Sequence, residues 1–375
     1  MKAADATPPV STTPLLVPAE NQVSPSAFKE LKRVRLAMAG IMQRAAEQLN
    51  KGSMPFLYWG AQWSPVQKTG VHGEAKWFFI GDIHGDFFAL HTLLEEVRKH
   101  PDAYVCFLGD LVDRGPHGME CFARLLEFAE NHRGSADPHF PRVVWILGNH
   151  DEGISINHKS EKRFDSRVEP AEFVDFLNKS IPSDWSEDEL NEWGALFVEV
   201  CERLPRAIIF QAGLLATHGG FPLEDRWPYI TTNEALHHQR CLGDFTWTRA
   251  STVPSKKGWK YDPQKRRHSS SFEYGYKDFE GFCKAIEQVF PVKCMVRGHD
   301  HVEGGFEIPK EYKETPLLTL NGFGFNYLSN SFKDYRPTLT LGVSECGEFP
   351  KVLQVPYLAE EFQEYTMNEN LIVPT

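Results

Sequence analysis

Short apolar runs, each ending at a glycine or a cluster of polar residues, recur along the chain from residue 77 onward. Runs of this length between turn residues predict buried β-strands. Apolar residues at helical spacing separate several of the runs, notably in Phe87–Lys99 and Gly118–Asn131. Strands that alternate with helices predict an α/β fold. The predicted strands are Trp77–Ile80, Val105–Leu108, Val143–Leu147, Leu214–Thr217, Lys293–Val296, Leu317–Leu320 and Leu339–Val343.

The first part of the chain has a different pattern. Residues 1–26 are rich in Pro, Ser, Thr and Ala, a composition typical of a disordered tail. Beyond Ser26, whose side chain suits an N-cap, apolar residues recur at helical spacing as far as Leu49. We therefore expect a helix over residues 27–50 that packs on the main domain.

Residues 51–375 are expected to form one large domain that contains an insertion. The acidic stretch Ser166–Glu202 carries tryptophans and Phe197 on a helical period, beginning at Trp185. This stretch predicts a helical region over about residues 155–203, inserted into the domain rather than folded separately. Its charged residues are expected to form a solvated helical face.

The charge balance narrows the class of partner. The chain has 40 Lys and Arg against 51 Asp and Glu, a net charge of −11, so its surface repels nucleic-acid phosphates and anionic membranes. No apolar run reaches the roughly 18 residues of a membrane span, and no signal-peptide core is present. Seven cysteines without a C-x-x-C pair predict reduced thiols. We expect a cytoplasmic protein with no nucleic-acid partner and no membrane span.

Polar blocks follow five of the predicted strands. In open α/β sheets, the loops at the carboxyl ends of strands share one crevice. Residues as distant as Asp82 and His299 are therefore expected to converge there. The blocks are G-D-I-H-G-D at 81–86, G-D-L-V-D-R-G at 109–115, G-N-H-D at 148–151, T-H-G-G at 217–220 and R-G-H-D-H at 297–301.

These blocks contain a set of oxygen and imidazole ligands without a thiolate, which suits Mn, Fe or Zn. Two ions would need one carboxylate between them, and Asp110, on a central strand, is the natural bridge. A water between two cations is acidified and becomes a nucleophile at neutral pH. We expect Asp82 and His84 on the first ion, and Asn149, His218 and His299 on the second.

The same blocks carry candidates for phosphate binding and proton transfer. Arg114 can grip phosphate oxygens bidentately, and Asp113 can orient His150, which would protonate the leaving oxygen. Arg249, in Trp247-Thr248-Arg249, is a second candidate phosphate ligand. The alternative is a surface arginine stacked on the Trp247 ring, with Arg266 and Arg267 nearby as substitutes.

Together these blocks resemble the metal-dependent phosphoprotein phosphatase (PPP) family of calcineurin-like metallophosphoesterases, whose pattern is GD-x-HG, GD-x-VDRG, GNH-E, HGG and a late R-G/A-H. The resemblance runs from about Trp77 to about Val355. It implies the family's αββα sandwich, with residues 51–375 as the catalytic domain. It also implies two divalent metal ions, with Mn expected in vitro and Fe or Zn as alternatives.

The resemblance assigns site residues as well. It implies the same six metal ligands, His150 and Asp113 as the acid pair, and Arg114 and Arg249 as phosphate-binding arginines. The Trp-x-Arg setting resembles the bacterial and phage branch of the family. The metal ligands that it implies are Asp82, His84, Asp110, Asn149, His218 and His299.

Three positions depart from the family pattern or are open. Asp151 stands where the family has Glu after Asn-His. His301 resembles the G-H-x-H of the wider superfamily, and is either a metal ligand or a hydrogen-bonded group behind the ligands. Tyr327 belongs either to the site wall or to the core.

The function expected from these residues is a protein phosphatase that hydrolyses phosphoserine, phosphothreonine or phosphotyrosine by direct attack of a hydroxide held between two metal ions. Its partner is then a phosphoprotein or phosphopeptide, and the sequence does not identify a regulatory partner. A small-molecule phosphatase or dinucleoside polyphosphatase is the enzymatic alternative, because a fold does not fix its substrate. A non-catalytic phosphate-binding protein would have lost ligands, and all six are present here.

Overall fold

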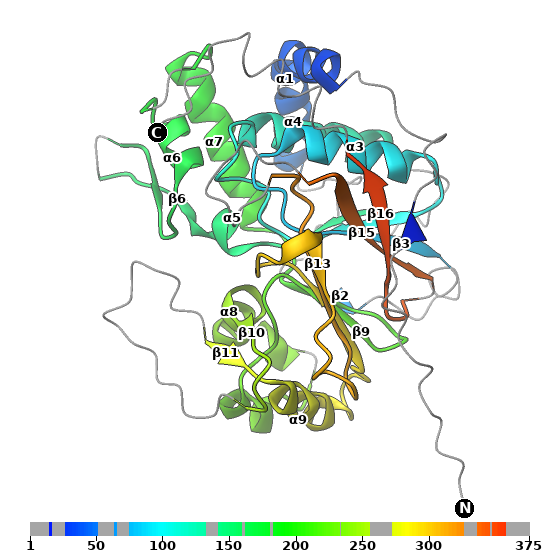
Figure 1. The fold of residues 1–375 in the computed structure, drawn as a ribbon. Coiled ribbons are helices and arrows are strands. Elements are labelled where there is room, and N and C mark those ends of the chain that lie inside the picture. Colours follow the sequence, from blue (N-terminus) through cyan, green and yellow to red (C-terminus); the bar gives the residue numbers. More distant parts are fainter. Residues whose placement is uncertain are drawn as a thin grey trace, which may run out of the picture.

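Two six-stranded β-sheets lie face to face at the centre of the molecule (Figure 1). The structure is a computed structural model. It describes residues 15–16, 27–51, 64–65, 75–132, 142–159, 162–180, 183–232, 234–255, 272–325, 336–345 and 347–357.

The first sheet has the order β1-β16-β15-β3-β4-β5. Three of its strands, β3, β4 and β5, run parallel, and β15 joins β3 in the antiparallel direction. β1 lies within the segment predicted to be a tail, and it pairs with β16. The strands are β1 (Leu15–Leu16), β3 (Lys76–Ile80), β4 (Tyr104–Phe107), β5 (Val143–Trp145), β15 (Thr338–Glu345) and β16 (Lys351–Pro356).

The second sheet has the order β13-β14-β12-β9-β8-β2. Its central strands β14, β12 and β9 are parallel, and β13 and β8 join them in the antiparallel direction. The strands are β2 (Ser64–Pro65), β8 (Ala207–Ile209), β9 (Leu214–Thr217), β12 (Cys294–Arg297), β13 (Phe306–Glu307) and β14 (Leu317–Leu320).

Side-chain alternation divides each central strand between two apolar layers. In β3, Trp77 and Phe79 face the second sheet, whereas Phe78 and Ile80 face the covering helices. Successive side chains of a strand point to opposite faces, so a strand buried on both faces is apolar throughout, as the short runs predicted.

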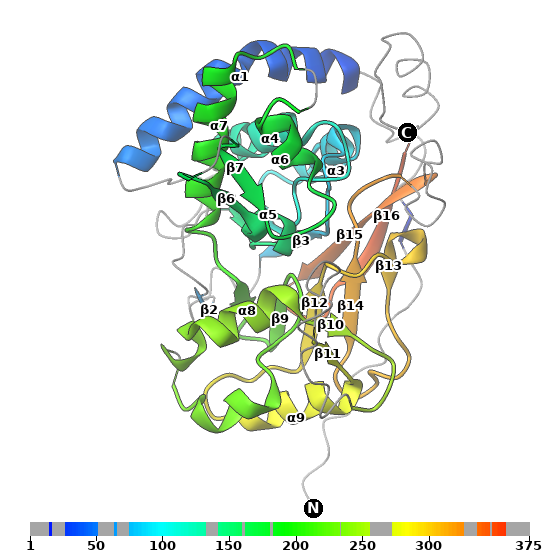
Figure 2. The ribbon, with the colours of Figure 1, turned by 90° about the vertical axis from the view of Figure 1, so that its left-hand side faces the viewer.

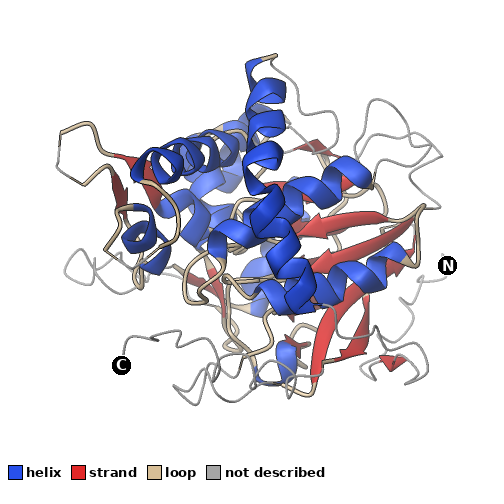
Figure 3. Ribbon diagram, turned by 90° about the horizontal axis from the view of Figure 1, so that it is seen from above, coloured by secondary structure: helices blue, strands red, loops and turns tan. Residues whose placement is uncertain are grey.

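Helices cover the outer face of each sheet. Figure 2 shows α1, α3, α4 and α7 on one side of the strands and α8 and α9 on the other, and Figure 3 shows helices over strands from above. The predicted αββα sandwich is thereby confirmed. The helices are α1 (Ala27–Asn50), α3 (Phe87–Arg98), α4 (Gly118–Asn131), α7 (Glu187–Cys201), α8 (Gln239–Trp247) and α9 (Tyr276–Ile286).

The predicted N-terminal helix is present as α1, and it packs on the main domain. Leu31, Val34 and Met38 are buried on its inner face. Ion pairs then join it to α4, since Arg35 Nε lies 2.8 Å from Glu120 Oε1 and Arg44 Nε lies 3.1 Å from Glu130 Oε2. The N-cap Ser26 lies outside the described residues.

The predicted insertion differs in part from the expectation. It begins with an antiparallel hairpin of β6 (Ile154–Ile156) and β7 (Phe164–Ser166), and continues through α6 (Glu172–Leu177) into α7. The helical period starts later than Trp185, because the Ser186 side chain accepts a hydrogen bond from Glu189 N and so caps α7. α7 buries its apolar face in the main core, and the insertion is not a separate unit.

All seven predicted strands are confirmed, as β3, β4, β5, β9, β12, β14 and β15, with bounds that differ by at most two residues. The sequence analysis did not predict β8 or β16. The six described cysteines are free and buried, whereas Cys346 lies outside the described part of the chain. No helix in the described ranges combines the length and apolar character needed to cross a membrane.

Candidate metal centre

The five polar blocks meet where the carboxyl ends of β3, β4, β5, β9 and β12 come together. The polar block after β4 contacts the block after β5 through Asp110, whose Oδ1 accepts a hydrogen bond from His150 N at 2.8 Å. The two sheets are joined by Asp82, whose Oδ1 accepts from His299 N at 3.0 Å. The six candidate ligands are all at most 3% exposed, namely Asp82, His84, Asp110, Asn149, His218 and His299.

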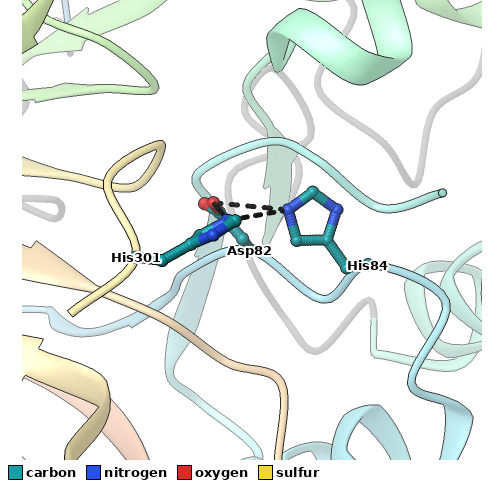
Figure 4. A group of neighbouring side chains, drawn as sticks. All are labelled: Asp82, His84 and His301. Carbon is teal, nitrogen blue, oxygen red and sulfur yellow. Dashed lines mark hydrogen bonds and ion pairs between the residues drawn. The ribbon is translucent and has the colours of Figure 1, made fainter. Parts of the chain in front are cut away.

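A first group of potential ligands consists of Asp82, His84 and His301 (Figure 4). Asp82 Oδ2 lies 3.8 Å from His84 Nε2 and 3.9 Å from His301 Nε2. The two imidazole Nε2 atoms are 3.2 Å apart. His301, which the sequence analysis left between ligand and supporting group, therefore points its ring nitrogen at the first group.

A second group consists of Asp110, His218 and His299. His218 Nε2 lies 3.2 Å from His299 Nδ1 and 3.4 Å from Asp110 Oδ2. Asn149 Oδ1 adds an amide oxygen 2.9 Å from His218 Nε2. The amide and imidazoles thus meet at one point, as the sequence predicted for the second ion.

Asp110 lies between the two groups. Its Oδ2 is 3.8 Å from His84 Nε2 and 3.4 Å from His218 Nε2, and Asp110 also belongs with His84 and His150 in a third group. This is the place that a bridging carboxylate requires.

Hydrogen bonds behind the ligands fix the imidazole tautomers. His84 Nδ1 lies 3.0 Å from Val112 O, and His218 Nδ1 lies 2.7 Å from Leu108 O. Since a carbonyl only accepts, Nδ1–H donates in each ring, and Nε2 is the nitrogen left to bind a metal.

The backbone adopts uncommon conformations at this site. Six non-glycine residues in the described ranges have positive φ, and all except Lys179 belong to the polar blocks. Such conformations cost free energy and persist where surrounding contacts impose them, often at functional sites. The five are His84 (φ 48°), Asp110 (φ 52°), Asp113 (φ 68°), Arg114 (φ 70°) and His299 (φ 68°).

The donor set fits divalent cations. Ligand atoms at about 2.0–2.2 Å from one ion lie about 3.0–3.5 Å from one another, and the imidazole pairs are 3.2 Å apart. His299 Nε2 is buried without a hydrogen-bond partner in the described structure. Burial and neighbouring cations hold the pKa of His84 and of His299 well below the usual range, so both rings are in the neutral form that a metal ligand requires.

The carboxylates of the site need positive charge nearby. Burial, reinforced by the charge of Asp110, raises the pKa of Asp82 to about 7. Asp82 Oδ2 and Asp110 Oδ2 each lie 3.8 Å from His84 Nε2, and two buried carboxylates that share a site disfavour each other's ionisation. Cations bound between them would offset this repulsion, which agrees with a metal centre.

His150 and Asp113 form a hydrogen-bonded pair beside the ligands. His150 Nδ1 is 2.7 Å from Asp113 Oδ2, and Asp113 Oδ1 accepts from Phe173 N at 2.9 Å. Burial disfavours the imidazolium, but the carboxylates of Asp110 and Asp113 outweigh burial and raise the pKa of His150. The ring is thus suited to carry a proton.

Arg114 faces the same ring. Its Nη2 lies 3.5 Å from His150 Nε2, and its backbone N donates to Glu172 Oε2 at 3.0 Å. Glu172 and Phe173 belong to α6, which the sequence analysis did not connect with the site. Their contacts are non-local, and no feature of the stretch around residue 172 indicates them.

Arg249 reaches the site from β10 (Arg249–Ala250), which pairs with β11 (Glu273–Tyr274). Its Nη1 donates to His299 O at 3.2 Å and to Asp300 Oδ1 at 2.7 Å. Arg167 lies over the Trp247 ring, with its Cζ 5.9 Å from the ring centroid. Asp300 was missed, although it stands inside the last polar block.

Asp151 keeps a supporting position. It follows His150 in α5 (Asn149–Gly153), and its carboxylate accepts from Leu111 N at 2.9 Å and Gly148 N at 3.2 Å. It thus ties the β4 loop to the β5 loop. Tyr327, Arg266 and Arg267 lie outside the described residues.

The calcineurin-like phosphoesterase model matches residues 76–303. This is more than half of the chain, and the chain belongs to that family. The resemblance drawn from the five blocks is thereby confirmed, and with it an enzyme of the metallophosphoesterase class whose family uses divalent metal ions. The likeness to the bacterial and phage branch stays a prediction.

Two curated relatives come from Caenorhabditis elegans. A serine/threonine-protein phosphatase is 25% identical over 64% of this chain and 46% of its own length. A second protein, provisionally named a serine/threonine-protein phosphatase, is 26% identical over 63% of this chain and 56% of its own. The chain therefore spans about half the length of the curated relatives it matches.

One solved structure supports the fold. A protein serine/threonine phosphatase from Saccharomyces cerevisiae with similarity to human phosphatase PP5 has a TM-score of 0.51 and 16% identity. The match covers 86% of this chain and 89% of that one. At this identity the likeness concerns the architecture alone.

Proposed function

We propose that the protein is a phosphoprotein phosphatase that hydrolyses phosphomonoesters of serine and threonine in a single step. The observation that carries the proposal is Asp110 between two groups of imidazole and carboxylate ligands, beside the His150–Asp113 pair. The curated relatives are named serine/threonine phosphatases, which favours a protein substrate.

Two sets of residues would hold the metal ions. Asp82, His84 and His301 would bind the first, and Asn149, His218 and His299 the second, with Asp110 shared. Bound divalent ions would supply an acidified water as nucleophile and offset charge on the phosphate. We take Mn as the ion for assays.

Arg114 would bind the phosphate oxygens. Its guanidinium lies against His150 Nε2, and its backbone is fixed by Glu172. A fixed, partly desolvated guanidinium stabilises charge on the equatorial oxygens during phosphoryl transfer. Arg249, held by His299 O and Asp300, would contribute a second contact.

His150 would protonate the leaving oxygen. Its Nδ1–H donates to Asp113 Oδ2, so the proton that it delivers is on Nε2. As the P–O bond breaks, that proton moves to the seryl or threonyl oxygen and the ring becomes neutral. Asp113 accepts the Nδ1 hydrogen and keeps the ring oriented.

A comparison of substrates tests this proposal. Purified protein with Mn is assayed on phosphoserine, phosphothreonine and phosphotyrosine peptides and on a dinucleoside polyphosphate, with Asp110→Asn as the inactive control. We expect the highest kcat/KM on the phosphoserine or phosphothreonine peptides. A higher kcat/KM on the dinucleoside polyphosphate would contradict the proposal, and binding of phosphate without turnover would indicate a non-catalytic protein.

A further inference from the structure

Asp300 joins two arginines of different burial. Arg297, in β12, is fully buried, and its Nη1 donates to Asp300 Oδ2. Arg249 is about a third exposed, with a side-chain exposure of 30%, and its Nη1 donates to Asp300 Oδ1 at 2.7 Å. One carboxylate therefore connects an arginine in the core to an arginine at the edge of the ligand cluster.

Arg297 is a fixed anchor for this arrangement. Its Nε donates to Gly219 O, one residue after the candidate ligand His218. Its Nη2 lies 3.5 Å from Thr248 O, one residue before Arg249. With its charge buried and its nitrogen atoms engaged, Arg297 holds Asp300 in one orientation.

Further contacts fix Asp300 on the remaining sides. Its Oδ2 accepts from Ala250 N at 3.2 Å, and its backbone O accepts from Asn321 Nδ2 at 3.0 Å. Asn321 also pairs with Asp82 in an isolated bridge. Asp300 is therefore tied to β10, which carries Arg249, and to the strand end that carries Asp82.

The guanidinium of Arg249 stands at the edge of the ligand cluster. Its Nη1 donates to His299 O at 3.2 Å, and its charge acts with burial to lower the pKa of His299. An arginine side chain otherwise loses rotamer entropy when a ligand fixes it. Asp300 orders that side chain before any phosphate arrives, which is preorganisation.

We propose that Asp300 is a positioning residue that holds the Arg249 guanidinium where it binds the substrate phosphate. The inference rests on the proposed function, in which Arg249 is a phosphate ligand. Asp300 acts through Arg249 and does not bind phosphate, because its carboxylate would repel the anion. The predicted consequence is that Asp300 matters only while Arg249 is present.

A double-mutant cycle tests this dependence. Inorganic phosphate is the probe, and its Kd for the Mn-loaded protein is measured by calorimetry beside its Ki against an aryl phosphate. Arg249→Ala should weaken phosphate binding about 10- to 100-fold, the range for losing hydrogen bonds to a charged group. Asp300→Ala should weaken it about 10-fold, and the double variant should be no weaker than Arg249→Ala within about two-fold.

A matched control separates positioning from loss of stability. Asp244 Oδ2 lies 2.9 Å from Arg226 Nε, so Asp244→Ala also breaks a carboxylate–guanidinium pair, but one that belongs to none of the groups of potential ligands. It should leave phosphate affinity unchanged. If Asp300→Ala does not fold, Asp300→Glu is the alternative variant, because it keeps the charge while displacing Arg249. It should weaken phosphate binding only when Arg249 is present.

Additive losses in the cycle would overturn the inference, and so would wild-type phosphate affinity in both Asp300 variants. The outcome for the proposed function is read separately. If the double-mutant cycle gives the expected phosphate affinities but the protein hydrolyses no phosphopeptide, the proposed function is contradicted and the role of Asp300 is kept. If the protein hydrolyses phosphopeptides but the losses in the double-mutant cycle are additive, the proposed function is kept and the role of Asp300 is contradicted.

Discussion

His150 Nδ1 lies 2.7 Å from Asp113 Oδ2, and Nε2 of the same ring lies 3.5 Å from Arg114 Nη2. This relationship places the proposed proton carrier and the proposed phosphate-binding cation side by side. Mutation can distinguish the two proposed roles, because His150 is proposed for proton transfer and not for the ligand sets.

His150→Asn is expected to keep the metals and to lower kcat by about 10²- to 10⁴-fold on a phosphoserine peptide, the range for a positioned general acid. The loss should be smaller on an aryl phosphate, whose leaving group needs no proton. Steady-state kinetics on both substrates checks this. Equal losses on the two would remove His150 from the acid role.

Asp110→Asn is expected to abolish turnover and to reduce bound metal at both positions, because Asp110 Oδ2 faces His84 and His218 together. Metal analysis after gel filtration, beside the activity assay, provides the measurement. Two retained equivalents with activity within a few-fold of wild type would show that Asp110 does not bridge.

His301→Ala is expected to raise the Mn concentration for half-maximal activity by roughly 10- to 100-fold, while excess Mn largely restores turnover. The reason is that His301 Nε2 lies 3.2 Å from His84 Nε2, whereas Asp82, His84 and the proposed bridge Asp110 would still hold the first ion. Titration of activity with Mn decides the matter. An unchanged midpoint would make His301 a bystander, and activity that no Mn concentration recovers would make it essential.

Gly148→Ala is expected to disrupt the site, because a Cβ at residue 148 would lie 2.1 Å from Asp110 N and 2.2 Å from Asp110 Oδ1. Metal content and Tm should both fall. Gly243→Ala, in α8, is the matched control, since nothing lies within 4 Å of its added Cβ. That change should raise helix stability by up to about 1 kcal/mol.

The attachment of α1 should weaken in acid. A bidentate hydrogen bond from Arg33 at 2.8 Å lowers the pKa of Glu30 to about 2, and Arg33 also pairs with Glu127 of α4. A depressed carboxyl pKa contributes stability above about pH 4.5, and that contribution is lost as the pH falls toward 2. Glu30→Gln should therefore cost about 1 kcal/mol or less at pH 7.

Urea unfolding at pH 7 and at pH 3 measures this contribution. The difference in midpoint between wild type and Glu30→Gln should shrink at the lower pH. Lys29→Gln, an exposed neighbour on α1, serves as the control and should show no such change. A difference that is equal at the two pH values would show that Glu30 does not stabilise α1 through its charge.

The sequence by itself determined seven of the strands and the identities of the metal-ligand candidates. Strands buried on both faces, such as β3 from Trp77 onward and β9, have short apolar runs as their sequences because these side chains are all buried. Their ends were marked by the polar blocks, and parallel strands bring such blocks to one edge. Asp82, His84, Asp110, Asn149, His218 and His299 were therefore found from local pattern and topology, and the structure brings them together.

Only the tertiary structure decided which groups support those residues. Glu172 holds the Arg114 backbone from 58 positions away, and Asp300 holds Arg249 from 51 positions away. Such contacts depend on where α6 and β10 dock, and docking is set by packing of whole apolar faces rather than by local residue pattern. The direction of the His301 side chain, toward Asp82 and His84, was also decided by the tertiary structure. It follows from the course of the backbone after β12 and not from the spacing of His299 and His301 alone.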